Sequence, residues 1–127
     1  MSRAVADTSV FVARAAGRPL AGDLPDELAV SVVTLAELRV GVLVAADTST
    51  RARRMATLRA AEELEPLPVD DGVATAWAAL RSALRDAGRS MPVNDSWIAA
   101  TALAHGVAVA TQDSDYDNAP GLRVVRL

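Results

Sequence analysis

Five short apolar runs are spaced along the chain, and they constrain its fold more than any other feature. Most of them lack the alternation of polar and apolar residues that marks a half-exposed strand, so they are typical of strands buried on both faces of a parallel sheet. Two prolines interrupt the third run, which favours a short or edge strand there. The predicted strands are residues 4–7, 28–33, 64–69, 106–111 and 122–127.

Helical patterns fill most of the sequence between these runs. Thr34 and Glu37 have the spacing of a capping box at the start of one helix, and a charged helical pattern follows over residues 50–64. Residues 15–27 contain glycine, proline and acidic residues and are expected to form a loop. Two further helices are expected after the third strand, one from Asp70 or Asp71 to Gly88 and one from Asn94 to Gly106.

Strands that alternate with helices indicate a parallel sheet covered by helices on both faces. The expected fold is therefore α/β, a three-layer α/β/α sandwich around a central, mainly parallel sheet of four to five strands. The chain has 127 residues, which is the length of about one domain. No linker, internal repeat or low-complexity tract divides it, so we expect residues 1–127 to form a single domain.

Composition excludes several functional classes. Cysteine is absent, which rules out disulfides and thiolate metal sites. All 13 residues counted as lysine or arginine are arginine, so no lysine is available for a phosphate-binding loop or a Schiff base. No apolar stretch approaches the ~18 residues of a membrane span, and the first residues lack the apolar core of a signal peptide. We therefore expect a cytoplasmic protein that does not associate with membranes.

Charge and aromatic content bear on nucleic-acid binding. The formal net charge of −3 argues against a non-specific nucleic-acid binder, and four aromatic residues are too few for a base-stacking platform. His105 precedes a glycine at the expected end of a helix, where the helix dipole favours it. One window without acids is either a solvated helix face or a local phosphate-attracting patch, and it contains Arg51, Arg53, Arg54 and Arg59.

The expected fold brings four acidic residues to one edge of the sheet. Asp7 ends the first predicted strand, and Asp113 lies two residues beyond the fourth. Glu37 and Asp95 lie in the first turns of two helices that run antiparallel to the strands, so both lie at the carboxyl edge. Each acid also has a local explanation as a capping, dipole or turn residue, and Asp7 could cap a short helix at residues 8–16.

Carboxylates gathered at one edge need a positive partner. Two unit charges about 4 Å apart repel by about 4 kcal/mol at an effective dielectric constant of about 20. The chain has no lysine, and its one histidine is not near these positions in the sequence. Hard divalent cations such as Mg²⁺ and Mn²⁺ prefer oxygen ligands and assist phosphodiester hydrolysis. The acidic edge therefore predicts a metal site and a polyanionic substrate.

Four segments, ADTSV, VVTLAEL, VNDSWIAATAL and VATQDSDY, resemble the motifs of PIN-domain ribonucleases in order and spacing. The resemblance extends from residue 5 to the end of the chain and is greatest to the VapC-like toxins of bacterial type II toxin–antitoxin pairs. It implies a PIN-like fold and an endoribonuclease that uses Mg²⁺ or Mn²⁺. It also implies an RNA substrate, a homodimer, and a VapB-like antitoxin that forms a hetero-oligomer with the toxin. Such an antitoxin would lie in a groove of apolar helices and could place an arginine in the acidic site.

The resemblance also assigns individual positions. It implies that the metal ion is held by Asp7, Glu37, Asp95 and Asp113, and that Asp115 joins them in the catalytic set. Hydroxyl residues that orient the carboxylates or phosphate would be Thr8 or Ser9, and Thr111.

The chain departs from the family pattern at two positions. Tyr116 stands where phenylalanine is commoner, and Gln112 stands where arginine is frequent, so one phosphate contact of the family is in doubt. Asp117 matches no motif and is interpreted as a solvated loop residue.

Two other classes of function stay open at this point. A metal-dependent phosphatase of the haloacid-dehalogenase type, or a receiver domain, also places an aspartate after its first strand. The phosphatase pattern needs a second acid two positions later, where Ser9 stands, and both classes normally need a lysine. A non-catalytic PIN-like module that binds RNA or regulates would lack some of the acids. Incubation with RNA in Mg²⁺, Mn²⁺ or EDTA distinguishes these possibilities.

Overall fold

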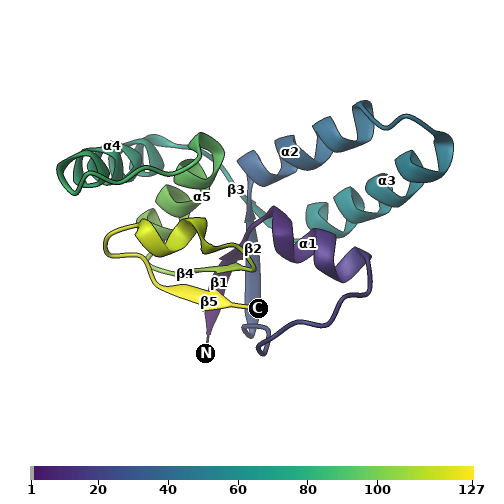
Figure 1. Ribbon diagram of the computed structural model, residues 1–127, viewed down its shortest axis with the longest axis horizontal. Coiled ribbons are helices and arrows are strands. Elements are labelled where there is room, and N and C mark those ends of the chain that lie inside the picture. Colours follow the sequence, from purple (N-terminus) through teal and green to yellow (C-terminus); the bar gives the residue numbers. More distant parts are fainter. Residues whose placement is uncertain (1) are drawn as a thin grey trace.

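A five-stranded parallel sheet forms the centre of the molecule (Figure 1). The structure, a computed structural model, describes residues 2–127. The strand order is β3-β2-β1-β4-β5, and every neighbouring pair is parallel. The strands are β1 Arg3–Ala6, β2 Glu27–Ser31, β3 Glu65–Leu67, β4 Ala108–Thr111 and β5 Val124–Arg126. The parallel sheet expected from the sequence is confirmed, with β3 and β5 at its edges.

Helices cover both faces of the sheet and complete a three-layer α/β/α sandwich. In Figure 1 the helices α1, α2 and α3 lie on one side of the sheet, and α4, α5 and the short 3₁₀ helix η1 lie on the other. The helices are α1 Thr8–Ala15, α2 Val32–Leu43, α3 Thr48–Glu62, α4 Asp71–Asp86 and α5 Val93–Ala104, with η1 at Ser114–Asn118. No helix within residues 2–127 combines the length and the apolar character needed to cross a membrane.

Two hydrophobic cores lie between the sheet and the helices on its two faces. Alternate residues of each strand belong to opposite cores. Val5 of β1 and Val109 of β4 pack with α4, α5 and η1. Their neighbours Ala4, Ala6 and Ala108 pack with α1, α2 and α3. Because the strands are buried on both faces, their sequences show apolar runs without polar alternation.

Side-chain caps confirm some of the predicted helix starts and correct others. Asp7 caps α1 by accepting from the amide of Ser9, and Asp70 caps α4 by accepting from Val73. Gly88 and Gly106 follow α4 and α5 with φ angles of 66° and 65°, which suits the helix stops predicted there.

The capping box predicted at Thr34 and Glu37 is wrong. Ser31 caps α2 instead, because its hydroxyl accepts from the amide of Val33, and the helix therefore begins at Val32. The start predicted at Asn94 is also wrong. Helix α5 begins at Val93, directly after Pro92, and has no side-chain cap.

The arginine window lies on α3, and two of its members fasten α3 to the end of α2. Arg54 donates to the carbonyl of Gly41 at 2.7 Å, and Arg51 donates to the carbonyl of Ala45 at 3.4 Å. Carbonyl oxygens at a helix C-terminus carry partial negative charge and favour cations. Arg53 instead donates to Ser49 and lines a groove between α1 and α3.

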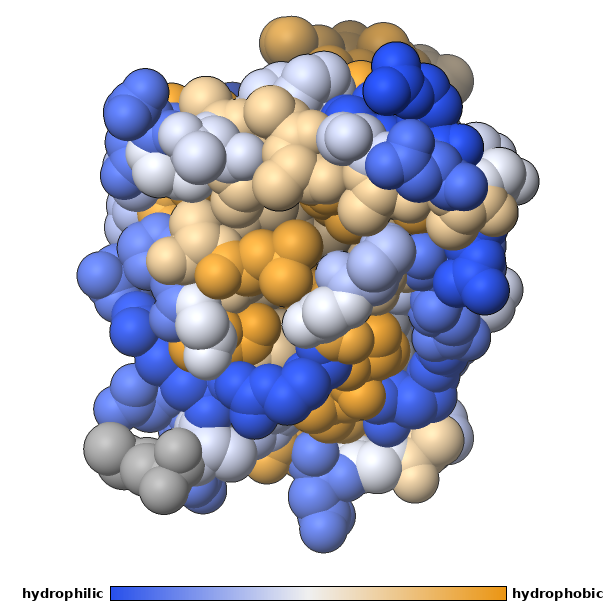
Figure 2. Space-filling view, turned by 90° about the vertical axis from the view of Figure 1, so that its left-hand side faces the viewer, coloured by the Kyte–Doolittle hydropathy of each residue, from blue (hydrophilic) through white to orange (hydrophobic). Residues whose placement is uncertain are grey.

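Figure 2 shows the left-hand side of the molecule as drawn in Figure 1, where apolar side chains lie between hydrophilic borders. A shallow hollow on this side has no charged lining residue and is formed by Ala76, Ala79, Leu80, Ala83, Leu103 and Pro120. None of the predicted metal-site acids lines this hollow.

Candidate active site

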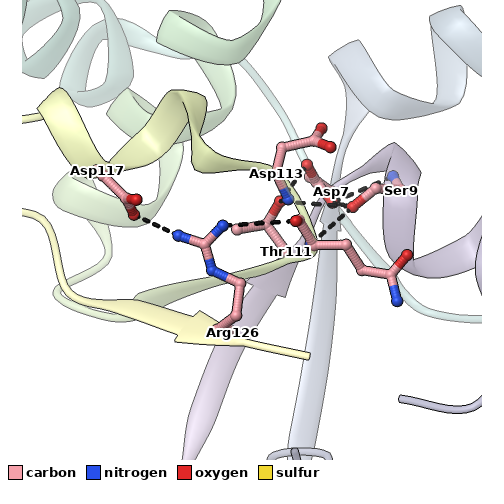
Figure 3. A network of polar contacts seen from close by, with 7 residues as sticks. Asp7, Ser9, Thr111, Asp113, Asp117 and Arg126 are labelled. Carbon is pink, nitrogen blue, oxygen red and sulfur yellow. Dashed lines mark hydrogen bonds and ion pairs between the residues drawn. The ribbon is translucent and has the colours of Figure 1, made fainter. Parts of the chain in front are cut away.

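Asp7 lies at the centre of a network of hydroxyl groups (Figure 3). It directly follows β1, its side chain is almost completely buried, and the residue is only 2% exposed. One carboxylate oxygen accepts from the hydroxyl of Ser9 at 2.6 Å, and the other accepts from Thr111 at 2.7 Å. The end of β1 is therefore joined to the end of its neighbour β4 by a buried aspartate.

The same hydroxyls position the loop after β4. Ser9 accepts from the amide of Gln112 at 2.9 Å, and Thr111 accepts from the amide of Asp113 at 2.9 Å. In Figure 3 the Asp113 carboxylate extends from this anchored backbone on the same side of the network as Asp7. Ser9 and Thr111 therefore both donate to Asp7 and hold the backbone that carries Asp113.

Glu37 reaches the same region from α2. The hydroxyl of Thr8, the first residue of α1, donates to Glu37 Oε1 at 2.8 Å. Glu37 therefore contacts α1. A capping box would instead have required it to contact the start of its own helix. Thr34 is fully buried, and its hydroxyl is the one buried side-chain group within residues 2–127 that lacks a hydrogen-bond partner.

Asp95 is held from the other layer of the fold. It lies in the first turn of α5, and Tyr116 of η1 donates its phenolic hydroxyl to Asp95 Oδ1 at 3.2 Å. Tyr116 is fully buried. Tyr116 departs from the family pattern in the sequence, but its contact with Asp95 is not predicted from the sequence.

Burial and nearby negative charges raise the pKa of two of these acids, Asp7 and Asp95. Burial raises the pKa of Asp7, the hydrogen bonds from Ser9 and Thr111 oppose this, and the charge of Asp113 adds to it. Burial also raises the pKa of Asp95 to about 6. The hydrogen bond from Tyr116 opposes that rise, whereas the nearby charges of Asp115, Asp7 and Glu37 increase it. Each of the five acids therefore lies near enough to at least one other for their charges to interact.

Burial is also the largest cause of the raised pKa of Tyr116, followed by the charges of Asp7 and Asp95. The phenol therefore stays protonated at neutral pH and donates to Asp95.

No basic side chain among residues 2–127 forms an ion pair with these acids. Five ion pairs occur within residues 2–127, and none of them includes Asp7, Glu37, Asp95, Asp113 or Asp115. The described part of the chain also contains no group of three or more acids close enough to enclose a metal ion. The oxygen-only donor set nevertheless fits a hard divalent cation.

Asp115 and Asp117, the two aspartates of η1, differ in their surroundings. Asp115 lies on η1, and its charge raises the pKa of Asp95, so it belongs to the acidic region. Asp117 instead forms an ion pair with Arg126, which also donates to the carbonyl of Gln112 at 3.4 Å (Figure 3). Asp117 was interpreted as a solvated residue, and it is exposed but paired. Arg126 was missed because only the register of β5 beside β4 places it opposite Thr111.

Most of the chain is similar to one known protein family. The profile of the PIN domain matches residues 4–122. The chain belongs to the PIN-domain family. The expected family is therefore confirmed, and the phosphatase and receiver-domain alternatives are set aside.

Named relatives of this PIN-domain chain include two ribonucleases of Mycobacterium tuberculosis. The chain is 50% identical to ribonuclease VapC5, over 97% of this chain and 94% of that protein. It is also 50% identical to ribonuclease VapC4, over 98% and 97% of the two chains. A crystal structure of VapBC-5, from the VapBC family of toxin–antitoxin systems of the same organism, matches with a TM-score of 0.91 at 46% identity and covers 100% of both chains.

Proposed function

We propose that this PIN-domain chain is a divalent-metal-dependent endoribonuclease toxin that a cognate antitoxin neutralises. The observation that carries this proposal is the delivery of acids from β1, α2, α5 and the end of β4 to one region without a basic partner. The likeness to proteins named as VapC ribonucleases supports RNA as the substrate.

The proposed roles follow from where each side chain lies. Mg²⁺ or Mn²⁺ would be held by Asp7, Glu37, Asp95 and Asp113, and Asp115 would help to place the attacking water. A bound divalent cation supplies stabilisation of the negative charge that develops on the phosphodiester. The hydroxyls of Thr8, Ser9 and Thr111 donate to carboxylates. We expect water activated by the bound cation to be the nucleophile, without a covalent intermediate on the chain.

The direct test is incubation of the pure protein with mixed RNA. Cleavage is expected with Mg²⁺ or Mn²⁺ and not with EDTA, and gel electrophoresis of end-labelled RNA measures it. RNA that stays intact in the presence of either metal would contradict a catalytic function and favour the non-catalytic module.

A groove beside Glu37 fits the antitoxin segment implied by the family. It runs between α1, α2 and α3, with Val12 and Leu38 among its apolar lining residues and Glu37 at the acidic site. A second depression shares Ala15, Arg53 and Thr57 with it, so the groove continues along α1 and α3. An amphipathic antitoxin helix could therefore bury its apolar face here and extend a basic residue toward Glu37.

Val12→Gln should weaken antitoxin binding by about 10-fold or more, because it removes the burial of one apolar side chain in the groove. Val12 is 43% exposed in the free chain, so the fold should tolerate the change. Calorimetric titration with the antitoxin encoded beside the toxin measures the effect. Val69→Gln is the matched control, since Val69 is 40% exposed and lies outside the groove. Equal affinities for both variants would place the antitoxin elsewhere.

A homodimer is the second assembly that we propose, with the outer face of α2 as its contact. Val40 and Leu43 are 56% and 77% exposed, although both are large apolar residues. Together with Val33 and Ala36 they follow the 3-4-3 spacing of a coiled-coil seam. A seam on one helix can pair with its own copy around a two-fold axis. A hollow that includes Val33 and Val40 also contains Glu37, so a second copy would border the acidic site.

Leu43→Glu should convert the dimer to a monomer, because it places like charges on both sides of a two-fold contact. Sedimentation equilibrium of the toxin alone measures the mass. Ala79→Glu, on the hollow over α4, is the control and should leave the dimer intact. A wild-type protein that sediments as a monomer would contradict the proposed homodimer.

A further inference from the structure

The two tryptophans of the chain stack on each other instead of filling a core. Within residues 2–127 the two hydrophobic cores include Phe11 and Tyr116 but neither Trp77 nor Trp97. Both tryptophans are partly exposed, and their rings are parallel to within 4°, with centroids 4.3 Å apart. Large aromatic side chains contribute mainly to cores and to binding interfaces. A tryptophan pair outside the cores therefore indicates an interface.

Arg81 adds a positive charge to this pair. It is exposed on α4, one turn after Trp77, and its guanidinium carbon is 5.5 Å from the centroid of the Trp77 ring. A guanidinium that lies over an aromatic ring keeps N–H groups at its edge for binding an anion. None of the five ion pairs within residues 2–127 includes Arg81. Its neighbours three and four residues away on the helix include no acid and are Trp77, Ala78, Leu84 and Arg85.

This tryptophan stack, formed by Trp77, Trp97 and Arg81, lies beside the turn that carries Asp95. Trp77 donates its indole N–H to the hydroxyl of Ser96 at 3.0 Å, and Ser96 directly follows Asp95 in the first turn of α5. Trp97 is two residues after Asp95, which is about 3 Å along a helix axis. Successive helical residues turn by about 100°, so these two side chains leave α5 in different directions. The stack is therefore next to the acidic site without being part of it.

We propose that the tryptophan stack binds one unpaired nucleotide of the RNA substrate beside the bond that is cleaved. The base of this nucleotide extends the aromatic stack, and Arg81 contacts its phosphate. Proteins recognise single-stranded RNA in this way, with bases stacked on aromatic rings and guanidinium groups. The few aromatic residues of the chain exclude a platform for several bases, but one stack suits one base. This inference rests on the proposed ribonuclease function and adds a substrate subsite to it.

Charge and position favour RNA over a protein as the occupant. Arg81 has no acidic neighbour on the surface of α4, and such a positive group attracts a polyanion. The groove that fits the antitoxin lies between α1, α2 and α3, on the other side of the sheet (Figure 1). That groove and its continuation contain no member of the tryptophan stack.

Tryptophan fluorescence tests the proposal directly, because Trp77 and Trp97 are the two tryptophans of the whole chain. The wild-type protein is titrated in EDTA, where no cleavage is expected, with a single-stranded RNA of about 10 nucleotides. The same strand annealed to its complement is the second probe. The single strand should quench the fluorescence, since a base stacks on an indole ring. The duplex should quench it far less, because its bases are already paired and stacked.

Arg81→Gln should weaken the binding of single-stranded RNA by about 10-fold, because it removes a phosphate contact and part of the stack. The slope of log affinity against log salt should become shallower by about 0.7, which is the share of one phosphate on a single strand. Fluorescence anisotropy of dye-labelled RNA measures both quantities without using the tryptophan signal. Circular dichroism verifies the fold.

Arg18→Gln is the matched control. Arg18 is also exposed and is in none of the five ion pairs within residues 2–127. It lies three residues beyond the end of α1, which covers the other face of the sheet (Figure 1). This variant should keep the RNA affinity and the salt slope of the wild type.

The outcomes separate this subsite from the function on which it rests. Single-stranded RNA that binds without quenching, or equal quenching by strand and duplex, would overturn the subsite. Equal RNA affinities of Arg81→Gln and Arg18→Gln would also overturn it, and quenching by the antitoxin but not by RNA would make the stack a protein interface. In each case, cleavage of RNA by the wild type with Mn²⁺ would leave the ribonuclease function standing. RNA that is neither bound nor cleaved would overturn both.

Discussion

Asp7→Asn should abolish RNA cleavage, with a fall in rate of about 10³-fold or more. The substitution keeps the shape of the side chain and removes its charge. Asp7 is the most central acid of the site, because its carboxylate joins the end of β1 to Thr111 at the end of β4. An amide can still bond to the hydroxyls of Ser9 and Thr111, so the loss should come from the missing negative charge and not from unfolding.

The same variant should be more stable than the wild type when metal is absent. Burial raises the pKa of Asp7, which means that ionisation of this buried group opposes folding at neutral pH. A neutral asparagine removes that cost, and a gain of about 1 kcal/mol would raise the melting temperature by about 4 °C. Loss of activity together with a gain in stability is the signature of a functional carboxylate rather than a structural one.

Cleavage of end-labelled RNA with Mn²⁺ and thermal melting in EDTA measure the two effects. Asp86→Asn is the matched control, because Asp86 ends α4 on the exposed surface and is 3.9 Å from Arg85. It should keep full activity. An Asp7→Asn protein that cleaves at the wild-type rate would contradict the assignment of Asp7 to the active site.

The sequence predicted the fold well because its strands are buried on both faces. Apolar runs without alternation have few other interpretations, and the helical patterns between them set the direction of each strand. From this topology alone, Asp7, Asp113, Glu37 and Asp95 could be assigned to one edge. In the structure, Thr111 joins Asp7 to the end of β4, and Thr8 joins Glu37 to the start of α1.

The misplaced features depend on competition between nearby side chains or on packing between layers. Thr34 and Asn94 are good capping residues, but Ser31 begins α2 three residues earlier, and α5 starts after Pro92 without a cap. The contacts of Thr8 with Glu37 and of Tyr116 with Asp95 join segments 29 and 21 residues apart. No sequence periodicity encodes such contacts, because they depend on how the helices pack against the sheet.

Metal and pH should change the stability of the folded protein in opposite directions. The pKa of Asp95 is raised from 3.8 to about 6, so the native state keeps a proton that the unfolded chain has already released between these values. By linkage, the free energy of unfolding of the metal-free protein falls as pH rises through this window and levels off above about 6. Asp7 contributes in the same direction, since its pKa is also raised.

The size of the pH effect is best isolated with Asp95→Asn. In EDTA, the free energy of unfolding of the variant relative to the wild type should rise by about 1 kcal/mol between pH 4 and pH 7.5. This value allows for the partial exposure of Asp95. Melting curves of both proteins at the two pH values give this difference, and titrations elsewhere in the molecule cancel. A difference that stays constant with pH would show that the pKa of Asp95 is close to its ordinary value.

Mn²⁺ should reverse the pH trend, because a cation between the carboxylates replaces repulsion with attraction. At a concentration 100 times the dissociation constant, binding to the native state alone adds about 2.7 kcal/mol, or about 10 °C in melting temperature. The increase in melting temperature should be large at pH 7.5 and small at pH 5. Protons compete with the cation for carboxylates whose pKa is raised. Asp95→Asn should lose most of the increase at pH 7.5. An equal increase in wild type and variant would indicate that Mn²⁺ binds elsewhere on the protein, because only a cation held by Asp95 is sensitive to that charge.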